Sequence, residues 1–285
     1  MLVILQPGNF TSLQDLGRWK MHEYGVPLSG AMDRNSAILA NMLLNNSIEA
    51  PVLEFTLVGP KIQWKQSGMA ALTGGRFNVH SNQTGLVPWN MAVHFEENEI
   101  WNFGPVKEGL RGYLAVKGGF LGTSSLGSCS MSMGVTEQVV FKKNDLISFG
   151  NTPEVKTERY AQIKATPLDE KKIYGYKGPE WHLWEQTGLD LFQKEWRLSK
   201  DHNRMGIRLM PFSPRHNHSI LTSPVLPGTV QWTPAGQLIV LMREGQTTGG
   251  YPRIFQLTES SINILAQKNT DEKFYFVHEP LNFKT

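Results

Sequence analysis

Three clusters of polar residues, each set among turn-forming residues, are the parts of this sequence best suited to chemistry. The first is the run Gln14–Arg18 (QDLGR), continued by Gly25–Asp33 (GVPLSGAMD). Asp15 and Arg18 stand three residues apart, so they can pair, and such a pair can orient the carboxylate or amide of a substrate. The same pair can equally be a loop salt bridge, which would stabilise the fold little.

The second cluster is the run Asn203–Arg208 (NRMGIR), in which Arg204 and Arg208 stand four residues apart across a glycine. The planar guanidinium group of arginine offers a fixed set of donors that suits carboxylates and phosphates. Two cations on an exposed surface would give the same pattern. The spacing therefore leaves an anion site and a solvated surface as alternatives.

The third cluster is the run Glu244–Pro252 (EGQTTGGYP). Its paired glycines, Gly249 and Gly250, allow backbone amides to approach an anion closely. The Gln and Thr side chains add neutral donors, and Tyr251 adds a phenol. A plain hairpin turn would need fewer donors, so this run favours a binding site.

A lone acid, Glu54, interrupts the apolar run Val52–Val58, which alternates as a strand does and places Leu53, Phe55 and Leu57 on one face. The opposite face then carries Glu54, either at an edge or as a buried general base with a raised pKa. The sequence alone does not choose between them.

Other familiar chemistry is missing. The chain has no phosphate-binding loop, no dinucleotide fingerprint, no hydrolase nucleophile elbow and no zinc-protease helix motif. His216 and His218 could be metal ligands, but their position beside Pro214 favours a loop, and we expect no metal site. Cys129 could be a nucleophile, but no partner is recognisable, so a small buried thiol is the preferred interpretation.

Composition limits the class of protein. The 285 residues carry 28 Lys and Arg against 25 Asp and Glu, a net charge of +3. A net charge this close to zero argues against a dedicated nucleic-acid or membrane binder. A single cysteine excludes an intrachain disulfide framework and favours a cytoplasmic protein. No apolar stretch is long enough for a membrane-spanning helix.

The elements that must position these clusters are mostly short strands, which favours a mainly β fold built from barrels or sandwiches. One clear helix is expected near residues 33–46, with Asp33 as its N-cap and Asn45-Asn46 as its stop. Weaker helices are expected at 259–267 and 189–195. Further strands are predicted at 69–73, 113–117, 139–149, 237–242 and 273–278.

The polar stretch 151–172 has no clear periodicity and is the predicted linker. It divides the chain into a domain over residues 1–150 and a second over residues 173–285. The two halves form either separate barrels or one interleaved body.

Several short motifs together resemble the biotin-dependent carboxyltransferase family, over nearly the whole chain. This family includes the second subunit of allophanate hydrolase, the C subunit of 5-oxoprolinase and the antagonist of a sporulation kinase inhibitor. The matching motifs are Gln14–Arg18, Gly25–Asp33, Ala40-Asn41, Leu53-Glu54, Gly59-Pro60, Tyr113–Gly119, Gly127-Ser128, Arg204–Leu209, Gly228–Gln231 and Gln246–Pro252.

The resemblance implies a mainly β, cyclophilin-like barrel fold and a partner of related fold, the B-type subunit. It implies a subunit of an ATP-dependent 5-oxoprolinase, a hydrolase that opens the lactam ring of 5-oxoproline to glutamate with A-type and B-type subunits. One alternative is a carboxyltransferase acting on urea or an amide, with biotin carried by another protein. The other alternative is a non-catalytic regulator that binds a B-type partner.

The resemblance also implies roles for individual residues. The catalytic candidates are Asp15, Arg18, Asp33 and Glu54, and the three acids are not ranked. The substrate-binding candidates, which supply cationic, amide and hydroxyl donors, are Gln14, Lys117, Gly118, Gly119, Ser128, Arg204, Arg208, Gln231, Gln246, Thr247, Thr248, Gly249, Gly250 and Tyr251. We expect them to converge on one cleft.

The chain departs from the family pattern in four places. The usual Gly-Ser-Arg-Ser-Thr is Gly127–Met131 (GSCSM), and a glycine-rich segment with an arginine is missing between Met133 and Lys142. The usual Asp-Arg is Glu244-Gly245, and the usual Ser-Glu-Gly is Ser223–Val225 (SPV). Losing two arginines weakens an anion site in the middle of the chain. Either the substrate is held differently, or this copy has drifted from full activity.

Overall fold

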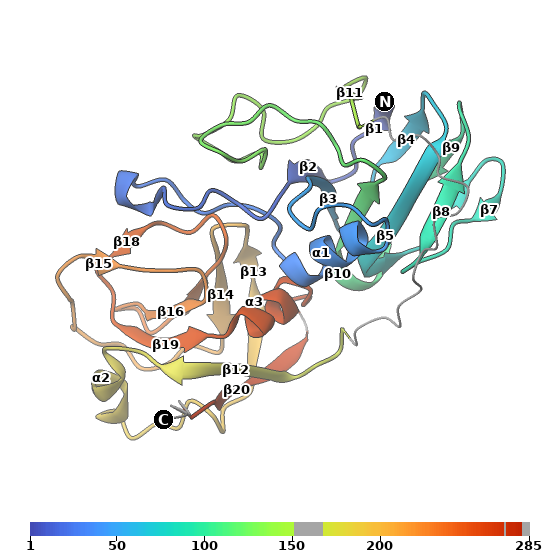
Figure 1. The fold of residues 1–285 in the computed structure, drawn as a ribbon. Helices are drawn as coiled ribbons and strands as arrows, with labels where there is room; N and C mark the ends of the chain where they lie inside the picture. Colours follow the sequence, from blue (N-terminus) through green and yellow to red (C-terminus); the bar gives the residue numbers. More distant parts are fainter. Residues whose placement is uncertain (151–167, 271, 281–285) are drawn as a thin grey trace, which may run out of the picture. The chain divides into compact units, whose positions relative to one another are not determined.

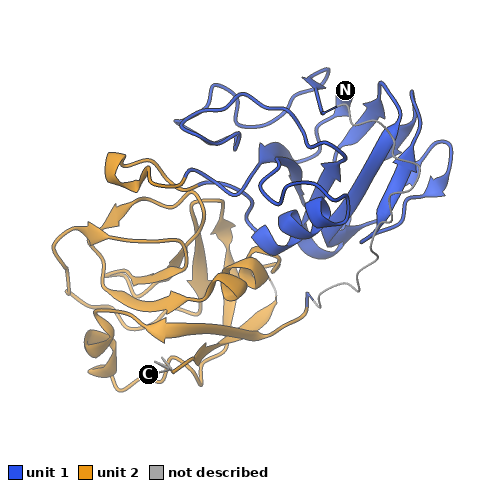
Figure 2. Ribbon diagram, in the orientation of Figure 1, with its two compact units in different colours: residues 1–18, 29–168 blue, residues 19–28, 169–285 orange. Residues whose placement is uncertain are grey.

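The chain forms two compact units in the computed structural model, which describes residues 1–150, 168–270 and 272–280. Unit 1 comprises residues 1–18 and 29–168, and unit 2 comprises residues 19–28 and 169–285 (Figure 2). The segment 19–28 thus groups with the C-terminal part of the chain. Most of the predicted linker, residues 151–167, lies outside the described residues.

Unit 1 is built from two antiparallel sheets (Figure 1). The six-stranded sheet has the order β11 (Leu146–Ile147), β1 (Leu2–Gln6), β4 (Lys61–Trp64), β9 (Ile100–Asn102), β6 (His80–Ser81) and β7 (Gly85–Leu86). The five-stranded sheet has the order β2 (Phe10–Gln14), β3 (Val52–Thr56), β10 (Val106–Val116), β5 (Gly68–Phe77) and β8 (Ala92–Phe95).

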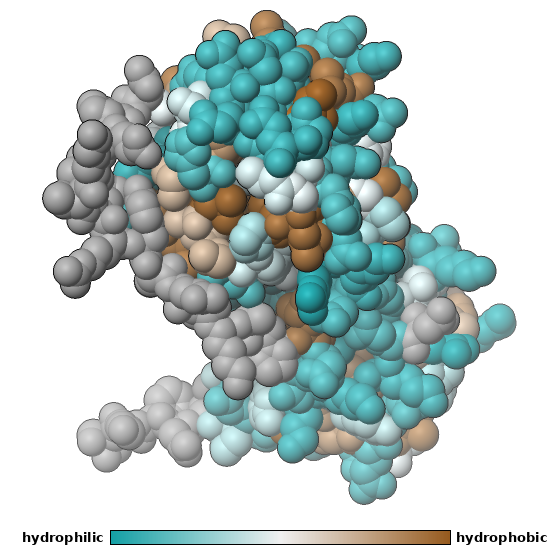
Figure 3. All heavy atoms as spheres, turned by 90° about the vertical axis from the view of Figure 1, so that its right-hand side faces the viewer, coloured by the Kyte–Doolittle hydropathy of each residue, from teal (hydrophilic) through white to brown (hydrophobic). Residues whose placement is uncertain are grey.

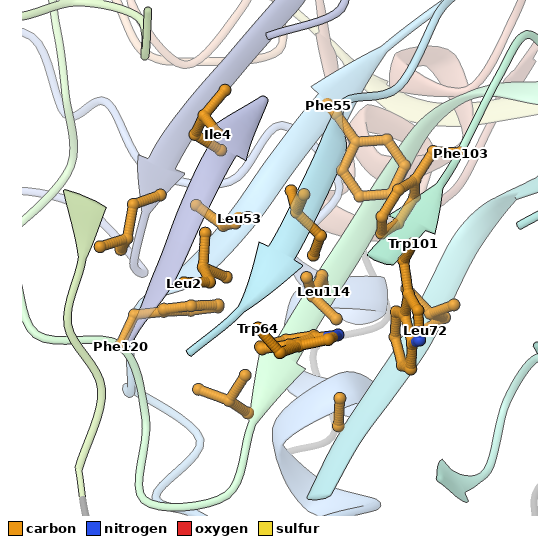
Figure 4. Close-up of a cluster of buried hydrophobic side chains, with 14 of the residues drawn as sticks. Leu2, Ile4, Leu53, Phe55, Trp64, Leu72, Trp101, Phe103, Leu114 and Phe120 are labelled. Atoms are coloured by element: carbon orange, nitrogen blue, oxygen red, sulfur yellow. The ribbon is translucent and has the colours of Figure 1, made fainter. Parts of the chain in front are cut away.

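The five-stranded sheet is buried on both faces, and its alternating side chains explain why. In β10, Leu114 and Val116 belong to a large apolar cluster, whereas Tyr113 and Ala115 belong to a second cluster on the opposite face. The large cluster includes side chains from both sheets of unit 1, among them Leu2, Ile4, Leu53, Phe55, Trp64, Leu72, Trp101 and Phe103 (Figure 4). Burying apolar side chains on both faces makes this sheet a rigid support.

The second face of that sheet is covered by α1 (Arg34–Met42), which contacts β3, β5 and β10. The helix begins as predicted, because the Asp33 carboxylate accepts hydrogen bonds from the backbone amide and hydroxyl of Ser36. It ends before Asn45, whose φ of 52° is left-handed. The prediction of one clear helix near residues 33–46 is confirmed.

Unit 2 is a closed barrel of seven strands. Its order is β12 (Lys172–Lys177), β19 (Arg253–Leu257), β16 (Thr229–Trp232), β17 (Leu238–Leu241), β14 (Gly206–Met210), β13 (Trp196–His202) and β20 (Lys273–His278). All pairs are antiparallel except β12 with β20, which is parallel and closes the barrel. A separate ribbon pairs β15 (Ser223–Pro224) with β18 (Thr248–Gly249). The predicted mainly β fold with a barrel is confirmed.

Three short helical elements complete unit 2: η1, a 3-10 turn (His22–Tyr24), α2 (Trp181–Glu185) and α3 (Glu259–Ala266). The helix predicted at 259–267 is therefore confirmed. The one predicted at 189–195 is wrong, because the indole N–H groups of Trp184 and Trp196 bind the carbonyls of Leu189 and Leu191 and hold a turn there.

Two strand predictions need correction. Of the run predicted at 139–149, only β11 is a strand, because the Asp145 carboxylate accepts hydrogen bonds from the Lys142 amide and the Gln138 side chain and fixes a turn. Leu57, predicted on the same face as Leu53 and Phe55, leaves β3 with a φ of 60° and is exposed.

On the face of the molecule seen in Figure 3, hydrophilic residues predominate and hydrophobic residues form small patches. Among the described residues, no helix has the length and apolar character needed to cross a membrane.

Candidate functional site

The first predicted cluster lies in unit 1, where Asp15 and Arg18 bind the loop 125–130. The Asp15 carboxylate accepts hydrogen bonds of 2.6–2.8 Å. Its donors are Gly17 N, Ser128 Oγ, Cys129 N and Ser130 Oγ. The fully buried Arg18 guanidinium donates to the carbonyls of Ser125, at 3.1 Å, and of Ser130. These two side chains therefore hold the loop in place, and their catalytic roles stay predictions.

Gln14 and Ser128, predicted to bind substrate, are also buried and bound to protein atoms. The Gln14 amide donates to Ser12 Oγ at 2.9 Å and to the Met131 carbonyl at 3.0 Å. These bonds attach the end of β2 to the segment that follows the loop 125–130.

The Tyr113 hydroxyl is hydrogen-bonded to the Glu54 carboxylate and to the backbone amide of Asp33. Glu54 Oε2 accepts hydrogen bonds from that hydroxyl and from the Met32 amide, each at 2.8 Å, and the Arg111 guanidinium lies 4.0 Å from Oε1. The Tyr113 hydroxyl in turn accepts from the Asp33 amide at 2.8 Å. Burial, and then the Glu54 charge, raise the pKa of Tyr113 well above its usual value. Glu54 is buried and β3 pairs with both β2 and β10, so the edge position is wrong, and the role of Glu54 as a general base stays a prediction.

Lys117 and Gly118 bind the residues that end α1. Lys117 Nζ donates to the Leu44 carbonyl at 2.9 Å, and the Gly118 amide donates to Asn46 Oδ1 at 3.0 Å. Gly119 follows with a φ of 74°, which favours glycine. These predicted binding residues thus form a turn against the helix terminus.

The second and third predicted clusters meet in unit 2. Arg204 Nε donates to Glu244 Oε1 at 2.7 Å, and the Glu244 amide donates to the Arg204 carbonyl at 2.9 Å. Both side chains are at least 90% buried. A charged pair so enclosed fixes the start of the run 244–252 against the turn 203–206.

Gln231, Gln246 and Gly249 form the centre of this region. Gln246 Nε2 lies 3.5 Å from Gln231 Oε1. Gln231 is 1% exposed, and within the described part of the chain its Nε2 has no hydrogen-bond partner. A Cβ added to Gly249 would lie 2.4 Å from that nitrogen, so glycine is what lets the amide lie against the loop. We call Gln231, Gln246 and Gly249 the amide cluster.

The other residues of the run surround the amide cluster. Thr247 and Gly250 accept backbone hydrogen bonds from Val225 and Ile220. Thr248 is exposed on β18, and Tyr251 is 40% exposed. The loop is therefore attached along its backbone, while the Thr248 and Tyr251 side chains reach the surface.

Arg208 does not join this region. It is exposed and lines a shallow hollow of about 770 Å³ with Lys200, Asp201, His202 and other residues. The two arginines of the second cluster therefore separate: Arg204 pairs with Glu244, and Arg208 faces the hollow.

One ion pair beside the run 244–252 was not among the residues predicted from the sequence. Arg253 donates to both carboxylate oxygens of Glu180 at 2.8–2.9 Å and to the Pro224 carbonyl at 2.9 Å. The hydrogen bonds from Arg253 hold the pKa of Glu180 below its usual value. Arg253 directly follows Pro252, so its position next to the third cluster could have marked it as a site residue. Its partner Glu180 lies 73 residues away in the sequence, and no motif marks it.

The predicted candidates fall in both units. Arg18 belongs to unit 1, and Arg204 and Gly249 belong to unit 2, so their meeting in one cleft stays a prediction. In residues 1–150, 168–270 and 272–280, no three His, Cys, Asp or Glu side chains gather as metal ligands would.

A family model described as carboxyltransferase domain, subdomain A and B, matches residues 24–278. The chain belongs to this carboxyltransferase family. Among its curated relatives, the C subunit of 5-oxoprolinase from Escherichia coli (strain K12) is 33% identical over 285 residues, covering 97% of this chain and 91% of the relative. The protein of the same name from Haemophilus influenzae is 28% identical, covering 94% of this chain and 87% of the relative.

Solved structures in the carboxyltransferase family share the fold. The crystal structure of the Kluyveromyces lactis urea carboxylase matches with a TM-score of 0.85 and 26% identity. That match covers 97% of this chain and only 27% of the urea carboxylase chain. The resemblance inferred from the motifs is confirmed, and the chain is homologous to the C subunit of 5-oxoprolinase, with urea carboxylases as more distant relatives.

Proposed function

We propose that this chain is the C-type subunit of an ATP-dependent 5-oxoprolinase, in which it acts with A-type and B-type subunits to open the lactam ring of 5-oxoproline. Its homology to the C subunit of 5-oxoprolinase in two bacteria supports the assignment. The observation that carries it furthest is the amide cluster, because the buried Gln231 Nε2 lacks a hydrogen-bond acceptor among the described residues.

The amide cluster suits a lactam. A buried donor left without a partner costs about 1–3 kcal/mol, which an incoming carbonyl oxygen would recover. In the proposed complex the Gln231 and Gln246 amides donate to the lactam carbonyl, where negative charge develops as the ring opens. The Arg204–Glu244 pair acts indirectly, by fixing the start of the loop that carries Gln246.

The described residues of this chain do not fit ATP. The hollow that contains Lys200 and Arg208 is shallow, and no glycine-rich loop among the described residues lines it to enclose a triphosphate. Arg18 and Arg204 already donate to a carbonyl or a carboxylate of the protein. We therefore assign ATP to the partner subunits. The cytoplasm stays the predicted location.

A carboxyltransferase that uses biotin carried by another protein is the second candidate, favoured by the urea amidolyase relatives. The amide cluster would serve it as well, because the carbonyl of urea accepts the same hydrogen bonds. A non-catalytic regulator would bind a B-type partner without turnover.

Reconstitution separates these candidates. The chain is mixed with purified A-type and B-type subunits, and glutamate released from 5-oxoproline is measured with and without ATP. We expect ATP-dependent release that falls at least about tenfold with Thr248→Ala, since Thr248 is exposed beside the amide cluster. Gln83→Ala, in an exposed turn of unit 1, is the control and should retain activity.

The other results decide against 5-oxoprolinase. Carboxylation of urea or an amide in the presence of a biotin-carrying protein would support the carboxyltransferase. Tight binding of the B-type subunit without any turnover would support the regulator.

A further inference from the structure

Unit 1 contains a cavity of about 540 Å³. Most of its lining residues belong to the long connection between β10 and β11, whose path Figure 1 shows. Small-molecule pockets of proteins commonly have 300–1,000 Å³. All the residues that line it belong to unit 1, whereas the amide cluster belongs to unit 2.

Part of the cavity lining is apolar. Leu13, Met131 and Ile147 are at least 92% buried and line it together with the partly buried Phe141. Met131 is fixed in place, because its sulfur accepts a hydrogen bond from the Leu13 amide and its own amide donates to the Leu13 carbonyl. This surface offers a bound molecule hydrophobic contact without charge.

Another part of the lining is polar but uncharged. Thr123, Ser124 and Ser125 supply hydroxyl groups, and the partly buried Cys129 supplies a thiol. The hydrogen bonds of Arg18 to Ser125 and of Cys129 to Asp15 fix these two lining residues in place. The cavity is therefore formed before any ligand arrives, which lowers the entropic cost of binding.

The charges around the cavity disfavour anions. Among the lining residues, which all lie in the described part of the chain, Glu137 is the one charged side chain. Behind the lining, the Asp15 carboxylate accepts the Cys129 amide hydrogen bond, and the Arg18 guanidinium on the same loop offsets its charge. A ligand carboxylate or phosphate would meet the Glu137 charge without a lining cation.

We propose that this cavity binds a small uncharged molecule with an apolar body and a hydrogen-bonding group. The site goes beyond the proposed 5-oxoprolinase function, because 5-oxoproline carries a carboxylate that this lining does not suit. Its occupant contacts the lining at Leu13, Phe141, Ser124 and Cys129, next to the loop that Asp15 and Arg18 hold.

Cys129 makes the proposal testable, because it is the chain's single cysteine and lines the cavity. The probes are two aromatic disulfides, uncharged dithiodipyridine and dianionic dithiobis-nitrobenzoate. With dithiodipyridine, the Cys129 thiolate attacks one sulfur, a mixed disulfide forms and one thiopyridone leaves. Each rate is divided by the rate of the same reagent with mercaptoethanol, which removes the reagent's intrinsic reactivity.

We expect the normalised rate to be at least about tenfold higher for the uncharged reagent. Its rate should also saturate with concentration, since binding precedes attack, and dipyridylethane, which has the same shape without a disulfide, should slow it competitively. Competition separates binding in the cavity from simple repulsion of the anion. A rate that stays linear in reagent concentration and unaffected by dipyridylethane would overturn the proposal.

A matched pair of variants locates the effect. Ser124→Trp places a large ring in the cavity and should abolish saturation and competition, whereas Ser67→Trp, at an exposed turn of the same unit, should leave both unchanged. Persistence of saturation in a folded Ser124→Trp protein would contradict binding at this cavity. If Ser124→Trp does not fold, saturation and competition in the unaltered chain still decide the matter.

Discussion

The polar cluster around Asp15 in unit 1 and the amide cluster in unit 2 both come from family motifs, yet they are built differently. Asp15 accepts four hydrogen bonds of 2.6–2.8 Å from its own loops. Gln231 is more deeply buried than Asp15, which is partly buried, but the Gln231 Nε2 has no acceptor among the described residues. One cluster is saturated by the protein, and the other retains a donor.

This difference separates two reasons for a buried polar residue. A saturated group stabilises the fold, because removing it leaves its partners unsatisfied. An unsatisfied buried donor weakens the fold until a ligand or an ordered water supplies the missing acceptor. We therefore expect substitutions in the first cluster to act mainly on stability and those in the amide cluster mainly on activity.

The largest effect is expected for Asp15→Ala. The substitution leaves two hydroxyls and two backbone amides without their acceptor, so the free energy of unfolding should fall by about 3 kcal/mol or more. Urea unfolding measures the change, with the exposed Asp201→Ala as the control. Equal stability of the two variants would remove the distinction between the clusters.

Gly249→Ala, in the amide cluster, and Gly250→Ala, the next residue outside it, form a matched pair. Neither glycine has a left-handed φ, so the two substitutions differ in the space around the new Cβ. A Cβ at Gly249 would lie 2.4 Å from Gln231 Nε2, whereas a Cβ at Gly250 would lie 3.7 Å from the nearest atom, the Ile220 carbonyl oxygen. Gly249→Ala should therefore lower glutamate release by the reconstituted complex about tenfold more than Gly250→Ala, with similar thermal unfolding. Equal activities would show that the position of the Gln231 amide is unimportant.

A smaller effect is expected in acid, at Glu180. Its pKa is lowered in the folded chain by Arg253, so the unfolded chain binds the proton more readily. The stabilisation is present above the ordinary glutamate pKa of about 4.3 and is lost as the pH falls through the lower, folded value. Glu180→Gln should flatten the pH dependence of the unfolding free energy over that range.

Glu185→Gln is the control for that measurement. Its hydrogen bond to Lys177 also lowers the pKa of Glu185, but this pair is exposed and screened by salt. The two variants should differ most at high salt. Identical pH profiles for both would contradict a specific contribution from Glu180.

The parts of the fold predicted correctly rest on local signals. The helix after Asp33 needed only a capping carboxylate and a left-handed stop, both within one short segment. Alternation placed Leu53 and Phe55 in the core and Glu54 on the other face. The turn at 189–195 was missed because indole hydrogen bonds from Trp184 and Trp196 override the local helical pattern.

The sequence motifs predicted which residues belong to the site, but they did not predict which of these residues pair with one another. Arg204 and Glu244 are 40 residues apart, and nothing in either motif marks the other as its partner. Gln231 was included only as part of a family motif, because burial without a hydrogen-bond acceptor has no sequence signature. Arg208 shares a motif with Arg204, but it faces a hollow away from Glu244.

Gln231→Leu tests the central claim most directly, through the unfolding free energy and the activity of the same purified variant. Leucine removes the unsatisfied donor and keeps much of the side-chain volume, so the free energy of unfolding should stay the same or rise, by up to about 3 kcal/mol. Glutamate release by the complex with A-type and B-type subunits should fall at least about tenfold. Full activity in this variant, or a loss of stability as large as that of Asp15→Ala, would contradict the account.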